Sequence, residues 1–472
     1  MPDFAKLDQQ FVWHPFTQMR DWLKREPIVI SSGKGAVLRD TRGRDYLDAN
    51  SSIWTNLHGH AHPKINAAIQ SQLKKISHSS ALGLANEPAS SLAERLVKAA
   101  NPPALRRTAR NPLLRKVFYS DDGSTAMEVA LKLAYAFAKR TGLSKKPKFL
   151  SLQGAYHGDT AGAVSLGHID LFHKAYAGLL FQTDRVMAPY CYRCPFNRAK
   201  PARADARDYR KCNHECIDLV EQKFAARKKK KHDPYAAIVV EPLMQGAAGM
   251  IPQPPGWLRR VAEIARAHGT QIIADEVMTG FARATGTASL FASHVEGVQP
   301  DFLALAKGMT GGYLPMAATL TTQTVFDAFL GDYAEFKTFF HGHSFTANQL
   351  GSAAALASLD LLQSPASLRA RQNVQQALQK ELQSLWSLPN VGDIRQVGLV
   401  SGIELVKDWQ TREPFSLAEQ SGIRICESMA RRGVLTRPIG NVIVLMPPYC
   451  STPKQISRMV QTLAESISAV LR

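Results

Sequence analysis

Short apolar runs that alternate with helical patterns are the feature of this sequence that most constrains its fold. The runs lie at 116–119, 148–152, 237–241, 271–274, 302–306 and 316–320, and candidate helices at 124–139 and 256–268 lie among them. This order is typical of βαβ units, so we expect an α/β fold with a mainly parallel sheet and helices on both faces. Ligands of such sheets gather at the carboxyl ends of the strands, which makes polar residues there candidates for a functional site.

The two ends of the chain follow a different pattern. The sequence predicts a hairpin at 36–47 around a Thr-Arg-Gly-Arg turn, long helices at 347–362 and 367–385, and short strands near 397–406 and 442–445. We therefore expect residues 1–60 to join a small α+β domain formed by 341–472. Residues 61–340 would form the large domain that binds the cofactor or ligand.

Composition and charge restrict the class of protein. The 472 residues are 45% hydrophobic and 21% charged, which is typical of a soluble globular protein with a large core. The net charge of +19 raises the alternative of a polyanionic partner. Much of the excess lies in residues 193–231, which end in Arg227-Lys-Lys-Lys-Lys231 and contain few aromatic residues that could stack on bases. We expect a solvated helix end or loop there and no nucleic-acid partner.

The sequence also indicates where the protein resides. No stretch approaches the run of about 18 uncharged apolar residues that a membrane span requires. The N-terminus, Met1-Pro-Asp-Phe-Ala-Lys-Leu-Asp8, lacks the basic and then apolar order of a signal peptide. We expect a cytoplasmic protein without a membrane partner.

Four of the six cysteines cluster in a basic insertion at about 189–232. They are Cys191, Cys194, Cys212 and Cys216, with His214 close by in the sequence. This spacing could hold a structural zinc ion. The alternative is that the four cysteines are reduced thiols in an insertion. The second cysteine pair is one residue wider than in a usual zinc ribbon, so we expect no metal and keep the four cysteines as candidates. A reducing compartment argues against disulfides.

Lys307 and Asp275 are the strongest candidates for chemistry. Each follows a short apolar run, at 302–306 and 271–274. A desolvated lysine amine is a nucleophile toward an aldehyde, and a carboxylate at a neighbouring strand end can keep a pyridinium nitrogen protonated. Together, these two residues have the functions that a pyridoxal phosphate enzyme requires of its active-site lysine and aspartate. Taken alone, Lys307 would be interpreted as a surface lysine and Asp275 as a helix-capping aspartate.

Two further segments follow predicted strands. Gly123, Ser124 and Thr125 lie in a turn before a helix, where backbone N–H groups and hydroxyls can hold a phosphate, although an ordinary helix cap uses the same residues. Tyr156 offers a planar ring that can cover a conjugated cofactor, with His157 and Asp159 fixing the loop; packing is the alternative. Near residue 341, Ser344 could supply another phosphate contact or merely precede a helix.

Taken together, these segments resemble the class III, or omega, aminotransferases of the pyridoxal phosphate fold type I superfamily. The matching segments are Gly123-Ser124, Tyr156-His157-Gly158-Asp159, Glu241 to Gly246, Asp275-Glu276, Lys307 and Gly342-His-Ser-Phe345. The resemblance implies pyridoxal 5'-phosphate as the cofactor, small-molecule substrates and a homodimer with shared active sites. It also implies that Ser344 reaches the phosphate in the partner subunit and that Gly342 and Tyr156 contact the substrate.

A narrower resemblance lies near the chain ends. Residues 12–19, 51–60 and 436–449 look like the adenosylmethionine-8-amino-7-oxononanoate aminotransferases of biotin synthesis. That likeness implies that Arg437 binds the carboxylate of the oxononanoate chain and that Trp54 lines a tunnel around its methylenes. The alternative for Arg437 is a surface ion pair.

Two positions depart from this narrower pattern. Phe16 stands where tyrosine is common, and Ile53 stands where a second tryptophan is frequent. Because a donor's polar groups are costly to bury without a partner, these changes favour lysine over S-adenosylmethionine as the amino donor. The rival function is another class III aminotransferase, of the ornithine, acetylornithine, diaminobutyrate or β-alanine type. A third possibility is that the protein is not an enzyme and that its basic segment binds nucleic acid or an acidic protein.

Overall fold

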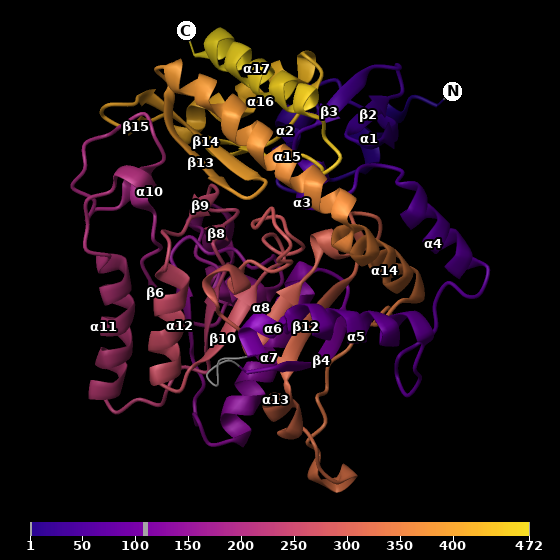
Figure 1. The fold of residues 1–472 in the computed structure, drawn as a ribbon, viewed down its shortest axis with the longest axis vertical. Helices are drawn as coiled ribbons and strands as arrows, with labels where there is room; N and C mark the ends of the chain where they lie inside the picture. Colours follow the sequence, from indigo (N-terminus) through magenta and orange to yellow (C-terminus); the bar gives the residue numbers. More distant parts are fainter. Residues whose placement is uncertain (1, 107–111, 472) are drawn as a thin grey trace.

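A seven-stranded sheet forms the centre of the computed structural model, which describes residues 2–106 and 112–471 (Figure 1). Its strand order is β4-β12-β11-β10-β7-β5-β6. The strands are β4 (Leu114–Ser120), β5 (Phe149–Leu152), β6 (Asp184–Val186), β7 (Ala237–Val240), β10 (Gln271–Asp275), β11 (Phe302–Leu305) and β12 (Ala317–Thr322). All but β12 run in the same direction, which confirms the prediction of a mainly parallel sheet.

The reversed direction of β12 follows from its short connection to β11. A parallel pair needs a crossover of about a dozen or more residues, usually a helix. The segment between β11 and β12 contains only one 3-10 turn, η4 (Lys307–Thr310). The chain therefore turns back, and β12 pairs antiparallel with β11 on one side and β4 on the other. This short connection leaves Lys307 at the strand end.

Helices cover both faces of this sheet, as predicted. On one face, α7 (Gly123–Arg140) and α8 (Ala161–Leu166) share an apolar cluster with strand residues such as Val239 and Ile273. On the other face, α11 (Glu215–Lys229) and α12 (Trp257–Ala267) pack with the alternate residues Ile238 and Ile272. Successive strand residues point to opposite faces, so each strand contributes to both cores.

The remaining elements of this region surround the sheet. They are α4 (Pro63–Leu73), α5 (Glu87–Ala100), α6 (Pro103–Arg106), α9 (Asp170–His173), α10 (Ala206–Tyr209), α13 (Gln323–Asp327), and the hairpin of β8 (Met244–Gln245) and β9 (Ile251–Pro252). Among the residues that the structure describes, no helix combines the length and the apolar character needed to cross a membrane.

Two smaller sheets combine segments from both chain ends. In the first, β1 (Ile30–Lys34), β2 (Val37–Asp40) and β3 (Asp45–Asp48) are joined by β16 (Val434–Leu435), which runs parallel to β3. The second contains β13 (Val391–Val397), β14 (Val400–Asp408), β18 (Val442–Leu445) and β17 (Pro438–Ile439), with β15 (Glu413–Pro414) beside β14. The antiparallel β2–β3 pair confirms the predicted hairpin.

Helices from the two chain ends accompany these sheets. They are α1 (Phe4–Phe11), α2 (Met19–Trp22), α3 (Ser51–Trp54), α14 (Gln349–Gln363), α15 (Pro365–Leu382), α16 (Ser421–Arg431) and α17 (Pro453–Val470). Figure 1 shows α15, α16 and α17 above the central sheet, with β13 and β14 nearby and the N-terminal strands beside them. The division of the chain at residues 60 and 340 stays a prediction.

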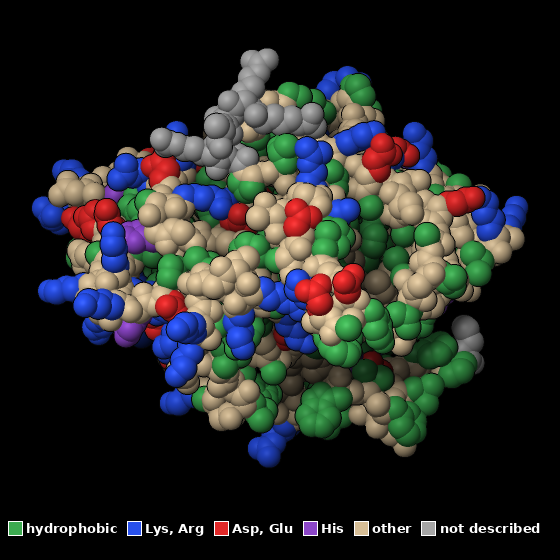
Figure 2. Space-filling view, turned by 90° about the horizontal axis from the view of Figure 1, so that it is seen from below, with side chains coloured by type: hydrophobic (Ala, Val, Ile, Leu, Met, Phe, Trp, Pro, Cys, Tyr) green, Lys and Arg blue, Asp and Glu red, His purple; other side chains and the backbone are tan. Residues whose placement is uncertain are grey.

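The basic, cysteine-containing insertion lies along one side of the molecule. Lys228–Lys231 are exposed at the end of α11, where positive charge is favourable to the helix dipole. Figure 2 shows Lys and Arg side chains scattered among acidic and apolar ones on the face that it presents. All six cysteines are free thiols, and residues 2–106 and 112–471 contain no group of three or more His, Cys, Asp or Glu residues arranged to hold a metal ion. The zinc hypothesis for Cys191, Cys194, Cys212 and Cys216 thus gains no support.

A buried ion network joins this insertion to the small sheet. Arg395 Nη1 lies 2.7 Å from Glu404 Oε2 and 3.0 Å from Asp393 Oδ2, and Arg193 from the insertion lies 2.6 Å from Glu404 Oε1. Arg395 also donates to the carbonyls of Gly249 and Met250 in the β8–β9 hairpin. Burial raises the pKa of Asp393 to about 7, while Arg395 and Arg193 outweigh burial and lower the pKa of Glu404.

Replacing Arg395 should destabilise the fold strongly. In Arg395→Ala, Glu404 and Asp393 would remain buried without their main cation, so we expect the free energy of unfolding to fall by about 3–5 kcal/mol. Denaturant titration followed by circular dichroism measures this loss. The matched control is Arg39→Ala, which removes an exposed pair with Asp45 and should change stability little. Equal, small losses in both variants would contradict the importance of the network.

Candidate active site

One cavity of about 440 Å³ lies at the carboxyl ends of the central strands. It is lined by residues that follow β4, β5, β7, β10 and β11, together with Trp54 from α3. Its lining includes Trp54, Asp121, Asp122, Gly123, Ser124, Tyr156, His157, Gly158, Glu241, Ala247, Asp275, Val277, Met278, Lys307 and Tyr313. The volume is in the range of small-molecule sites, and the position at the strand ends agrees with the rule for α/β sheets.

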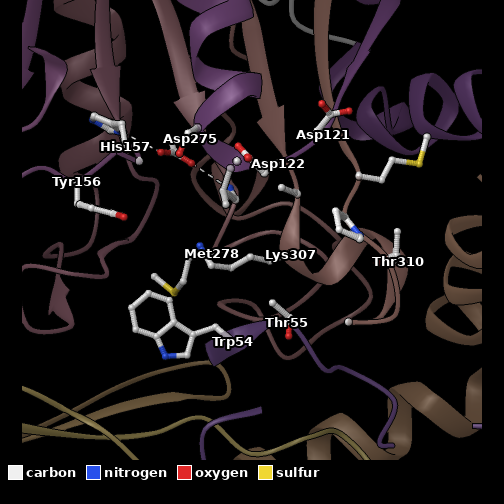
Figure 3. A pocket seen from close by; sticks show the side chains of 18 of the residues that line it. Trp54, Thr55, Asp121, Asp122, Tyr156, His157, Asp275, Met278, Lys307 and Thr310 are labelled. Atoms are coloured by element: carbon white, nitrogen blue, oxygen red, sulfur yellow. Dashed lines mark hydrogen bonds and ion pairs between the residues drawn. The ribbon is translucent and has the colours of Figure 1, made fainter. Parts of the chain in front are cut away.

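Lys307 extends into this cavity from the first position of η4. Its φ of 42° lies in the left-handed region, which is costly for a residue with a side chain. Burial lowers the pKa of its amine, and the charges of Asp275 and Glu241 offset only part of this effect. Figure 3 shows the lysine side chain crossing the cavity, with Asp275 on one side and Trp54 on the other. A lysine with a lowered pKa is more often neutral and thus more nucleophilic.

Asp275 ends β10 and is held by two hydrogen bonds. Its Oδ2 lies 2.7 Å from Nδ1 of the buried His157, and its Oδ1 accepts from the backbone N–H of Val277 at 3.0 Å. Burial lowers the pKa of His157, but the hydrogen bond and charge of Asp275, with the charge of Glu241, outweigh it and raise this pKa. The pair therefore places a fixed, oriented carboxylate at the strand end.

Glu241 is a cavity residue for which the sequence predicted no role. It follows β7, and its carboxylate accepts from the backbone N–H of Gly246 at 2.8 Å. Burial raises the pKa of Glu241 to about 7, although nearby His157 opposes this shift. The strand-end rule that identified Asp275 applies equally to Glu241, so the signal was present in the sequence.

The turn at 123–125, which the sequence predicts to bind a phosphate, contains residues with two different roles in the structure. Asp122 and Thr125 form a capping box for α7, because the Asp122 carboxylate accepts from Thr125 N at 2.9 Å and Thr125 Oγ1 accepts from Asp122 N at 2.9 Å. Thr125 thus fulfils the helix-cap alternative. Gly123 and Ser124 line the cavity instead, and Ser124 Oγ accepts from Asp159 N at 3.1 Å.

Neighbouring side chains approach this turn so closely that a Cβ would clash at two glycine positions. A Cβ on Gly123 would lie 2.6 Å from Cγ1 of Val277, and a Cβ on Gly158 would lie 2.1 Å from Oγ of Ser124. Gly158 also has a φ of +117°, which side chains other than glycine rarely adopt. The resulting cradle brings the N-terminal N–H groups of α7 to the cavity, where they can bind an anion.

Tyr156 forms part of the cavity wall. Its hydroxyl donates to Asp159 Oδ2 at 2.7 Å, and burial together with this contact raises its pKa above the usual value. The loop that carries it is also tied to Glu241, which lies 3.4 Å from the Tyr156 backbone nitrogen. The ring is therefore held in the cavity lining, and its stacking on a cofactor stays a prediction.

Four sequence-predicted site residues lie outside the cavity lining of this single chain. They are Phe16, Gly342, Ser344 and Arg437, and all four are exposed. Phe16 is connected to the site indirectly, because its ring lies 5.3 Å from that of Phe172, which lies 6.4 Å from that of Tyr156. The backbone carbonyl of Ser344 accepts from His78 Nε2 at 2.8 Å.

The cavity fits pyridoxal phosphate, the cofactor that the resemblance implies. Gly123 and Ser124 would hold its phosphate at the positive end of α7. Asp275 would face the ring nitrogen, and Lys307 lies within the same cavity to bond the aldehyde. The cavity is large enough for a small molecule and has Gly123, Ser124, Asp275 and Lys307 in its lining, so the residues present suit this group.

Comparison with known proteins places the chain in a family. Residues 19–467 match the family Aminotransferase class-III. A relative from Geobacter sulfurreducens, named adenosylmethionine-8-amino-7-oxononanoate aminotransferase, is 47% identical over 100% of this chain and 99% of its own length. A protein of the same name from Anoxybacillus flavithermus is 44% identical over 99% of this chain and 97% of its own length.

Solved structures agree with this result. A crystal structure of adenosylmethionine-8-amino-7-oxononanoate aminotransferase from Methanocaldococcus jannaschii matches with a TM-score of 0.87 and 38% identity, covering 99% of each chain. An omega transaminase from Pseudomonas jessenii, solved in complex with PMP, matches with a TM-score of 0.87 and 25% identity, covering 99% of this chain and 98% of that chain. This chain therefore belongs to the class III aminotransferases and is a pyridoxal phosphate-dependent aminotransferase.

Proposed function

We propose that this aminotransferase transfers an amino group to 8-amino-7-oxononanoate and forms 7,8-diaminononanoate in biotin biosynthesis. The observation that carries the proposal is the 40–47% identity to five relatives whose names contain this acceptor, across 98–100% of the chain. The site offers what such a reaction needs, since Lys307 and Asp275 share one cavity with the apolar wall of Trp54. The proposed enzyme is cytoplasmic and has no nucleic-acid partner.

Lys307 and Asp275 have different functions in proton transfer. When bound, pyridoxal phosphate supplies an electron sink for the charge left when a proton departs from the carbon that bears the amino group. Lys307 Nζ accepts that proton and later returns it, which its lowered pKa favours because more of the amine is neutral. Asp275, oriented by His157, places a negative charge where the ring nitrogen binds and thereby favours its protonated form.

The cavity wall suits a substrate with a methylene chain. Trp54 packs against an apolar cluster of Met244, Met250, Met278, Val400, Val444 and Met446. Of these residues, Trp54 and Met278 line the cavity and offer apolar surface to methylene groups, and the others form the buried layer behind them. We propose that Arg437 binds the terminal carboxylate, because its exposed guanidinium can contact both carboxylate oxygens at once.

We also propose a homodimer with shared active sites. Ser344 and Gly342 are exposed outside the chain's own cavity, which leaves them free to contact a partner's cavity. Phe340 and Phe345, close to them in sequence, are exposed, and so are Leu82 and Leu84 in the segment that follows His78, which bonds to Ser344. Exposed apolar groups of this kind favour protein interfaces. Ser344 would then donate its hydroxyl to the phosphate bound by the partner.

The acceptor can be tested in a single half-reaction. Enzyme in the pyridoxamine form should recover the pyridoxal absorbance when 8-amino-7-oxononanoate is added, because the ketone removes the amino group. Lys307→Ala should lose at least about 100-fold in rate, since proton transfer then lacks its base. Ornithine- and β-alanine-derived carbonyl compounds serve as comparison substrates. Faster recovery with these compounds than with 8-amino-7-oxononanoate would favour the rival class III function.

We expect lysine to be the better amino donor. The Phe16 ring contacts the aromatic ring of Phe172 and brings no hydroxyl toward Tyr156, so a polar donor group would lack that partner. The names of the relatives contain adenosylmethionine, and both donors therefore enter the test. Stopped-flow bleaching of the pyridoxal absorbance compares their rates. A faster reaction of the parent enzyme with S-adenosylmethionine than with lysine, and a further increase of that rate in Phe16→Tyr, would contradict the lysine assignment.

Mixed dimers can test the sharing of active sites. Lys307→Ala and Ser344→Glu each disable one half of a shared site, so each variant alone should be inactive. Unfolding and refolding the two together should restore about a quarter of the parent activity, because half of the dimers would contain one intact site. No recovery, despite dimers of both variants in sedimentation analysis, would show that Ser344 serves its own subunit.

A further inference from the structure

The segment that carries Trp54 has an unusual backbone. Ser51, Ser52, Ile53 and Trp54 form α3 with φ values of 47°, 46°, 62° and 69°. A run of left-handed residues without glycine is rare, because each Cβ crowds the following carbonyl oxygen. Such strain persists only where the surrounding structure holds the segment in place, and it is frequent at functional sites.

Asp48, at the end of β3, provides much of this support. Its Oδ1 accepts from the backbone N–H groups of Asn50 at 3.2 Å and Ser52 at 3.0 Å. Its Oδ2 accepts from Ser52 Oγ at 2.9 Å and lies 2.9 Å from His60 Nε2. Asp48 as a whole is 2% exposed, and the hydrogen bonds to its carboxylate outweigh burial and keep its pKa below the usual value. Asp48 is therefore a charged anchor for the strained turn.

Further contacts fix the anchor and the turn from other sides. Asn56 Nδ2 lies 2.9 Å from His60 Nδ1, so the imidazole that faces Asp48 is itself oriented. Ser51 Oγ donates to the carbonyl of Met446 at 2.7 Å, which ties the turn to the segment after β18. The turn is thus held by groups from both ends of the chain.

The turn determines where the Trp54 ring lies. Trp54 Nε1 donates to Asn50 Oδ1 at 2.8 Å, which orients the indole relative to the same turn. The ring centroid then lies 5.4 Å from Nζ of Lys307 (Figure 3). On another side, the indole lies beside Gly246, where an added Cβ would make ordinary van der Waals contact with it at 3.5 Å. A shift of the turn would move the ring away from Lys307.

We propose that Asp48 is a positioning residue: it holds the left-handed turn so that Trp54 stays against Lys307 and forms the wall that contacts the substrate chain. The substrate fit therefore depends on a carboxylate outside the cavity lining. This inference rests on the aminotransferase activity of the family and is independent of which acceptor the enzyme uses.

A double-mutant cycle tests whether Asp48 acts through Trp54. Asp48→Ala should lower kcat/KM for the preferred substrate by about 10- to 100-fold, since small misplacements of a positioning group have effects of this size. In a Trp54→Ala background the same change should cost less than about twofold, because the group being positioned is gone. Equal losses in the two backgrounds, or no loss in either, would overturn the proposal.

Two further variants guard against a general effect on folding. Ser52→Ala removes one contact to Asp48 and should lower kcat/KM in the same direction by a smaller factor. Asp45→Asn changes another carboxylate of β3, which pairs with exposed Arg39, and should leave kcat/KM unchanged. A loss in Asp45→Asn equal to that in Asp48→Ala would refute a specific role for Asp48.

A second readout does not require turnover. Acrylamide quenching of tryptophan fluorescence in the cofactor-free protein, corrected with matched Trp54→Phe variants, reports the accessibility of Trp54. We expect Asp48→Ala to increase this quenching and Asp45→Asn to leave it unchanged. Unchanged quenching in Asp48→Ala would overturn the proposal whichever acceptor is used, whereas failure of 8-amino-7-oxononanoate to react with the parent enzyme would refute only the proposed function.

Discussion

The electrostatic balance at the Lys307 amine is the constraint on which the site depends. Burial removes water from the amine and lowers its pKa, while Asp275 and Glu241 pull the pKa upward. Too little burial would leave an ordinary protonated lysine, and too little negative charge would make an amine in this position costly to bury. The fold meets both conditions because β7, β10 and β11 are neighbours and their last residues meet at one edge.

Backbone strain accompanies this arrangement at two places. Lys307 has a φ of 42°, and the turn from Ser51 to Trp54 is left-handed throughout. Left-handed conformations cost roughly 1–2 kcal/mol per residue with a side chain. Hydrogen bonds to buried groups such as Asp48 and Met446 offset part of this cost. Rigid surroundings thus hold both the lysine and the aromatic wall in positions that the free chain would avoid.

The chain ends contribute to the site through the smaller sheets. The parallel β3–β16 pair joins residues near 47 to residues near 434, and Asp48 lies at its edge. The Arg395–Glu404 network ties the small sheet to the β8–β9 hairpin, whose Ala247 lines the cavity. The position of Trp54 in the cavity wall is therefore connected to the stability of the smaller sheets.

Local patterns in the sequence were enough to predict the central strands, the helix after Gly123, and the meeting of Lys307 and Asp275 at the strand ends. These features depend on apolar periodicity and on the rule that parallel strands present their carboxyl ends together. Tertiary structure alone decided the pairing of the reversed β12 with β4, the raised pKa of the buried Glu241 and the bond that ties the Trp54 turn to the segment after β18. These depend on contacts between residues distant in sequence, such as the bond from Ser51 to Met446, which no local pattern encodes.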